Sequence, residues 1–95
     1  MIRSFADRAT ERFFEDGLCP ARWRAFEQSA YHKLDVLAAA TSLDDLRSPP
    51  GNRLEMLKGD RKGQWSIRIN RQWRICFHWT DEGPEDVEIV DYHRG

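Results

Sequence analysis

The sequence predicts an α+β protein in which two N-terminal helices pack on one face of a twisted antiparallel sheet of four to five strands. Three observations support this fold class. Apolar residues in the first half recur every three or four positions, as they do in helices. Apolar residues in the second half alternate with polar ones, as they do in half-buried strands. Turn sequences separate these alternating stretches, so consecutive strands should pair as a meander.

Two helices are expected in the first 40 residues. Asp7 can cap a helix that runs on to about Asp16, where Gly17 should end it. A second helix is expected over residues 22–40. Its apolar stripe consists of Trp23, Phe26, Ala30, Leu34 and Leu37. Such a stripe must be covered by a sheet or by another helix.

The strands are expected mainly after the break at residues 48–52. A short opening strand is expected at residues 2–5, and four further strands at 54–58, 65–69, 73–80 and 87–92. The turns between them fall at 59–63, 70–72 and 81–86.

Period-two alternation assigns the faces of the sheet. Trp65, Ile67 and Ile69, together with Trp73, Ile75, Phe77 and Trp79, should meet the helices. The opposite face should carry Arg68, Arg74, Cys76 and His78. We therefore expect Arg68 and Arg74 to point toward solvent or a ligand.

Length and composition restrict the class of protein. Ninety-five residues suffice for one core, so a single domain over residues 1–95 is expected. The longest stretch without a charged residue, 36–43, is too short to span a bilayer, and the N-terminus has no apolar signal core. Cys19 and Cys76 have neither CxxC nor Cys/His spacing. We therefore expect a cytoplasmic protein with no membrane partner, metal or cofactor.

Charge is unevenly distributed along the chain, although the formal net charge is only −1. The segment 53–74 holds seven cations and two carboxylates, which leaves it at +5. The segment 81–91 holds six carboxylates and no base. One interpretation is a solvated surface with an acidic turn; the other is a basic patch for phosphates beside an acidic turn.

Three motifs carry candidate functional residues. Lys58 ends an expected strand and enters a glycine turn, and Arg74 projects away from the expected core. An acid, a phenol and an imidazole follow one another at Asp91, Tyr92 and His93. These motifs, in this order, resemble the HigB family of toxins, the host-inhibition and plasmid-maintenance killer proteins of the RelE-like superfamily.

The resemblance spans the whole chain and is weakest between residues 16 and 40, whereas the stretch 46–54 is similar to the GraT-like branch in particular. It implies a RelE-like fold and ribosome-dependent cleavage of mRNA. It also implies neutralisation by a helix-turn-helix, HigA-like antitoxin. Operator DNA would be bound only through that antitoxin.

By position, the resemblance implies catalytic roles for Lys58, Arg74, Asp91, Tyr92 and His93. Metal-free RNA cleavage needs cations on the phosphate oxygens, which Arg74 and Lys58 supply. His93 can transfer a proton, Asp91 can orient a base or act as one, and Tyr92 can stack on a nucleobase. The remaining cations of the basic segment are then the expected RNA-binding residues: Arg53, Arg61, Lys62, Arg68 and Arg71.

One position departs from the family pattern. Members of the family have a histidine three residues before the lysine, where this chain has Glu55. The substitution removes a candidate base or cation and adds a negative charge beside the phosphate path. Two other interpretations also stay open: Arg74 could pair with Glu88 or Asp91, and His93 could be inert near the chain end. The chain could then be a non-catalytic module that acts on ribosome function or as an antitoxin-bound co-repressor.

Overall fold

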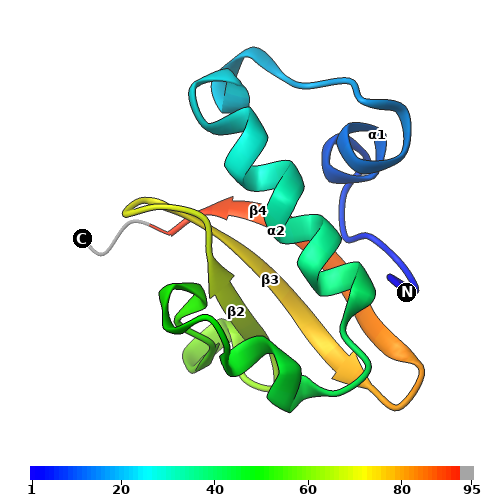
Figure 1. Ribbon diagram of the computed structural model, residues 1–95, viewed down its shortest axis with the longest axis vertical. Coiled ribbons are helices and arrows are strands. Elements are labelled where there is room, and N and C mark those ends of the chain that lie inside the picture. The colour runs from blue at the N-terminus through cyan, green and yellow to red at the C-terminus, as the bar shows by residue number, and fades with distance from the viewer. Residues whose placement is uncertain (93–95) are drawn as a thin grey trace.

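The computed structural model describes residues 1–92. Two α-helices, α1 (Arg8–Asp16) and α2 (Glu27–Ala39), precede a four-stranded sheet in chain order. The strands are β1 (Glu55–Met56), β2 (Trp65–Arg68), β3 (Trp73–Thr80) and β4 (Gly83–Asp91), paired antiparallel in the order β1-β2-β3-β4. Figure 1 shows α2 lying across the sheet with α1 beside it. The expected α+β class is confirmed.

Local capping sets both ends of α1. The Asp7 side chain accepts a hydrogen bond from the Thr10 amide at 2.8 Å. Gly17 takes a left-handed conformation (φ 73°) and its N–H donates back to the helix. Phe13 is buried on the inner face. The helix therefore begins and ends where its cap residues predicted.

The second helix differs from the prediction at its start. A 3-10 helix, Ala21–Phe26, comes first, and α2 begins only at Glu27. Phe26 interrupts the helical path (φ −127°, ψ 26°), and its ring lies against Trp73 with ring centroids 5.2 Å apart. Packing at the end of the sheet thus breaks a segment whose apolar period looks continuous.

The core lies between the helices and one face of the sheet. The helices contribute Phe13, Trp23, Ala30, Leu34 and Leu37, and the strands contribute Ile67, Ile75, Phe77, Val87 and Ile89. The tryptophans of β2 and β3 are partly buried against this cluster, as expected. We call this face the helix side of the sheet.

The last strand begins earlier than predicted. Gly83 and Pro84 were expected in a turn, but they pair with Thr80 and Trp79, and only Asp81 and Glu82 separate the strands. The Pro84 carbonyl accepts from the Arg3 amide, so the Pro84 backbone points away from β3. Its missing N–H therefore costs no bond to β3.

A β-bulge interrupts the pairing of β3 with β4. His78 pairs with Glu85 and Cys76 pairs with Glu88, so Asp86 and Val87 together face one residue of β3. Asp86 has a positive φ of 53°. The bulge directs Val87 and Ile89 into the core, and Glu88 to the opposite face.

The expected opening strand forms one parallel bridge, between Phe5 and Val87, rather than a full strand. Backbone bonds join it to β4, including Ala6 N–H to Val87 C=O at 2.9 Å. The expected strands at 54–58 and 65–69 are likewise shorter than predicted. Within residues 1–92, none of the helices has the length and apolar character needed to cross a bilayer.

Candidate active site

Arg74 and Tyr92 lie together on the opposite face of the sheet, which we call the loop side because residues 57–64 lie against it. The strand register aligns Glu55, Ser66, Cys76 and Glu88 across the four strands on this side. The orientation of Cys76 and Arg74 away from the helix core is thus confirmed. Cys76 is fully buried, and the Arg74 side chain is only 14% exposed.

Residues 57–64 account for the burial of Cys76, which lies near Arg61. Leu57 is buried (3% exposed) but is separate from the helix-side core, as is Cys76. Desolvation raises the pKa of the Cys76 thiol to about 11. The loop side therefore has a small interior of its own beneath a segment for which the sequence predicted only the end of a strand and a turn.

Arg74 is held from several directions. Its Nη1 donates to the Ser66 hydroxyl at 2.7 Å and to the Arg53 carbonyl at 3.3 Å, and it lies 3.4 Å from a carboxylate oxygen of Glu55. The Arg74 guanidinium also lies over the Tyr92 ring, 5.4 Å from its centroid. Arg74 is therefore preorganised, with a fixed orientation before any ligand is bound.

An open pocket of about 470 Å³ adjoins this arginine. It is lined by Arg53, Leu54, Glu55 and Arg74, so two cations and one carboxylate share it. Arg53 itself is exposed and takes a left-handed backbone conformation (φ 46°). The pocket suits an anionic group that can exchange with Glu55 at Arg74.

The loop that places Arg53 is anchored by Asn52, which is fully buried. Its amide nitrogen donates to the carbonyls of Leu46 and Ser48, each at 3.2 Å, and its oxygen accepts from the Lys33 ammonium. The loop is thereby fixed to α2. The sequence assigned no role to Asn52 within the break at residues 48–52, because an asparagine beside prolines and glycine is typical of loops in general.

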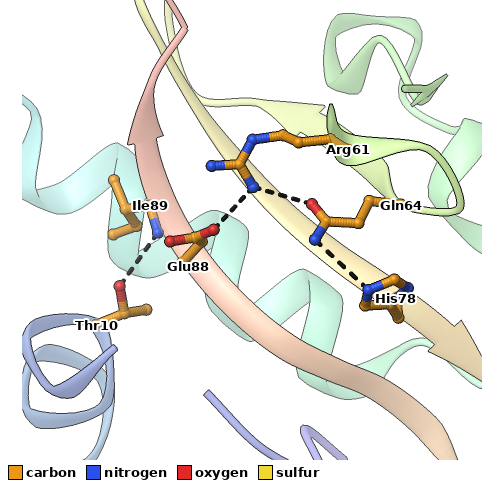
Figure 2. Close-up of polar contacts among 6 residues, drawn as sticks. All are labelled: Thr10, Arg61, Gln64, His78, Glu88 and Ile89. Carbon is orange, nitrogen blue, oxygen red and sulfur yellow. Dashed lines mark hydrogen bonds and ion pairs between the residues drawn. The ribbon is translucent and has the colours of Figure 1, made fainter. Parts of the chain in front are cut away.

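Lys58 is exposed and lies at the start of a 3-10 turn, Gly59–Arg61. In the same segment, Arg61 donates to Glu88 at 2.8 Å and to Gln64 at 3.0 Å (Figure 2). Gln64 lies 3.5 Å from a ring nitrogen of His78. The ion pair of Glu88 is therefore with Arg61, whereas that of Arg74 is with Glu55.

The last residues are only partly brought together with Arg74. Tyr92 follows β4, and its N–H donates to the Gln72 carbonyl at 2.7 Å. Asp91 pairs with Trp73 in the register, which places it on the helix side, and its carboxylate accepts from Gln72. His93 lies outside the described residues.

The expected RNA-binding cations fall in different environments. Arg53, Lys62 and Arg71 are exposed. Arg68 is half-buried and donates to the Asn70 carbonyl at 3.0 Å, and Arg61 is half-buried in its ion pair. Residues 1–92 contain no group of three metal-ligating side chains.

Ser66 is the site residue that sequence reasoning missed. It is fully buried and accepts the shortest of the hydrogen bonds from Arg74. It shares a face of β2 with Arg68, but a serine on the polar face of a strand gives no further signal in the sequence. Only the diagonal register between β2 and β3 shows that it meets Arg74.

Solved structures share this arrangement of helices and sheet. A YoeB–YefM complex from Staphylococcus aureus contains a chain that superimposes with a TM-score of 0.62 at 19% identity, covering 99% of this chain and 97% of that one. A YoeB/ParE toxin from Agrobacterium tumefaciens gives a TM-score of 0.52, also at 19% identity, covering 98% of each chain. The chain therefore shares the fold of these two proteins, in agreement with the expected arrangement of helices and sheet.

Sequence comparisons define the family more narrowly. Residues 3–93 match the model of the HigB-like toxins, described as RelE-like toxins of the type II toxin–antitoxin system HigB. Toxin HigB-1 of Vibrio cholerae is 44% identical over 85 residues, which cover 85% of this chain and 86% of that protein. Endoribonuclease HigB of Proteus vulgaris is 30% identical over 93 residues, covering 98% and 100%. The chain belongs to the HigB-like toxin family, as its sequence motifs predicted.

Proposed function

We propose that this toxin is an endoribonuclease that cuts messenger RNA on the ribosome without a metal ion. The observation that carries the proposal is Arg74, which is preorganised between Ser66, Glu55 and the Tyr92 ring beside an open pocket that Arg53 also lines. The name of the Proteus vulgaris relative supports the activity. Ribosome dependence follows from the family resemblance.

The reaction can be assigned to residues. The 2′-hydroxyl attacks the adjacent phosphorus, the bond from phosphorus to the 5′-oxygen breaks, and a 2′,3′-cyclic phosphate and a 5′-hydroxyl result. Arg74 grips the phosphate with paired N–H donors, and Lys58 adds a second positive charge as the transition state forms. The proton of the 2′-hydroxyl passes to Asp91 or to a base that Asp91 orients, and His93 protonates the leaving 5′-oxygen.

Tyr92 seats the nucleotide. Its ring already packs against the Arg74 guanidinium, so a nucleobase can stack on the same aromatic group while the phosphate contacts the arginine. The flanking RNA backbone is guided by the other basic side chains that the sequence predicts to bind RNA: Arg53, Arg61, Lys62, Arg68 and Arg71.

A helix-turn-helix, HigA-like antitoxin completes the proposed system. The family description names a type II toxin–antitoxin system, and a solved structural neighbour is a complex with YefM. Operator DNA is contacted only through the antitoxin, and the toxin acts in the cytoplasm, where the ribosomes are.

The test is primer extension on mRNA incubated with ribosomes and the purified protein. The wild type should produce discrete cuts with cyclic phosphate ends, and Arg74→Ala should reduce cutting by roughly 100-fold or more, because a preorganised charge on the phosphate is lost. Arg47→Ala, which removes an exposed arginine paired with Asp44, is the matched control and should cut normally.

A non-catalytic growth inhibitor is the second candidate. It is favoured because the Glu55 carboxylate already pairs with Arg74, the cation that would otherwise bind the phosphate. The same assay separates the two. If the wild type makes no discrete cuts in this assay but still inhibits the growth of cells that express it, the nuclease is contradicted and a binding module is supported.

A further inference from the structure

The ion pair between Arg61 and Glu88 joins two elements that the main chain leaves loosely connected. The guanidinium Nη1 and the carboxylate oxygen are 2.8 Å apart, and the side chains are only 33% and 21% exposed. Figure 2 shows Arg61 extending from its loop toward Glu88 on β4, with Gln64 between Arg61 and His78. Two contacts from one loop thus reach both β3 and β4.

Main-chain pairing alone holds this loop weakly. The strand before it, β1, contains only two residues, and one further backbone bond, Leu57 N–H to Gln64 C=O at 2.9 Å, closes the base of the loop. Buried Leu57 supplies the apolar contact. Side-chain contacts from the loop to the sheet must therefore contribute to its position.

The position of Arg61 determines that of Lys58. The Arg61 N–H donates to the Lys58 carbonyl at 3.3 Å, and the Gln64 N–H donates to the Arg61 carbonyl at 2.9 Å. Lys58 and Arg61 therefore belong to one hydrogen-bonded turn. If Arg61 were released from Glu88, Lys58 would move with the turn.

A direct RNA contact explains Arg61 less well. Its Nη1 is engaged by two acceptors, Glu88 and Gln64. The bond to Glu88 raises the pKa of the Arg61 guanidinium above its ordinary value. A phosphate would have to displace a charged partner that is itself mostly buried, which costs free energy that exposed Lys62 would not incur.

We propose that Arg61 and Glu88 are positioning residues for the cleavage reaction: their ion pair clamps residues 57–64 to β4 and so holds Lys58 over the loop side of the sheet. This inference rests on the proposed function. In this inference Arg61 does not bind RNA directly; it contributes to cleavage by holding Lys58 in place.

The experiment is a double-mutant cycle in the ribosome-dependent cleavage assay. Glu88→Gln, Arg61→Gln and the pair together are made in the wild type and in Lys58→Ala. In the wild type, each change should lower kcat roughly 10- to 100-fold with KM within about twofold, since misplacing a catalytic group affects mainly the chemical step. The double variant should be no worse than either single one.

In the Lys58→Ala background, Glu88→Gln should cause no further loss, because the clamp acts through the missing lysine. Arg61→Lys keeps a cation opposite Glu88 and should restore most of kcat. Circular dichroism melts confirm that each variant is folded. Arg47→Gln with Asp44→Asn breaks an exposed ion pair of the same type and should leave kcat unchanged.

Three outcomes would overturn the clamp. The Glu88→Gln variant could cleave RNA as fast as the wild type. Alternatively, Glu88→Gln could lower kcat by the same factor in the wild type and in the Lys58→Ala background. Arg61→Gln could weaken RNA binding while Glu88→Gln strengthens it, which would make Arg61 an RNA ligand. Absence of cuts by the wild type is a separate result, which rejects the nuclease itself.

Discussion

The two faces of the sheet are built by different means. On the helix side, Ile75 and Phe77 are fully buried beneath α2 in a continuous apolar core. On the loop side, ion pairs and a hydrogen-bonded turn cover a small interior around Cys76. Apolar burial stabilises without directional demands, whereas charged groups need particular partners. The helix side should therefore contribute most of the folding stability, and the loop side should determine the geometry of the candidate active site.

The largest effect should come from the helix side. Leu34→Ala removes a fully buried side chain of α2 and should lower the free energy of unfolding by roughly 2–5 kcal/mol, because it leaves a cavity. Urea denaturation measures this loss. Leu18→Ala truncates a leucine that is 57% exposed and should change stability by less than about 0.5 kcal/mol. Equal effects of the two substitutions would contradict the role of the buried helix-side core in stability.

The interior of the loop side can be probed through Cys76. Burial raises the pKa of its thiol from the ordinary 9.0 to about 11. In a Cys19→Ser chain, alkylation of Cys76 at pH 8 should be about a hundredfold slower than that of an exposed thiol, since only the thiolate reacts. The folded protein retains the thiol proton as the pH rises above 9, so stability should decrease between pH 9 and 11. Rapid alkylation at pH 8 would show that residues 57–64 do not seal this face.

Asn52 connects the two faces, because it links α2 to the loop that carries Arg53. Asn52→Ala leaves the Leu46 and Ser48 carbonyls and the Lys33 ammonium without this partner. The expected loss is roughly 1–3 kcal/mol of folding free energy, measured by thermal or urea unfolding. Gln28→Ala, on the exposed surface of α2, should leave stability unchanged. An Asn52 variant as stable as the wild type would show that the loop is fixed by other contacts.

The smallest effect concerns affinity for RNA. Glu55→Gln removes the charge that faces Arg74 and should tighten binding of a single-stranded RNA about two- to fivefold, because partly exposed ion pairs contribute up to about 1 kcal/mol. Fluorescence anisotropy at fixed salt measures the change. Glu82→Gln, at an exposed pair with Arg3, is the control. Weaker binding by Glu55→Gln would mean that the carboxylate serves the RNA rather than competing with it.

Local signals predicted much of the fold. Asp7 and Gly17 determine the ends of α1 through their own hydrogen bonds and dihedral angles, so a short window of sequence contains the information. The alternation around Ile75 likewise determines which side chains of β3 face the helices. These elements agree with the prediction because their causes lie within a few residues.

The contacts at the candidate site could not be predicted in this way. Arg74 meets Glu55 and Arg61 meets Glu88 across strands that are distant in the sequence, so the partners depend on register. The motifs identified Lys58, Arg74 and Tyr92 as functional candidates. They carried no information on the buried Ser66 or on the burial of Cys76 beneath residues 57–64.

The extra residue in β4 has a consequence for the site at the far end of that strand. Side chains normally alternate along a strand, so Glu85 and Glu88, three positions apart, would point to opposite faces of a regular strand. Because Asp86 and Val87 together face one residue of β3, both glutamates lie on the loop side instead. Deleting Asp86 would give a regular ladder that still pairs Glu88 with Cys76, so the faces of the residues that follow would not change. A residue inserted after Glu88 would have no such bulge to accommodate it, and it would turn the Tyr92 ring away from Arg74 without altering either side chain.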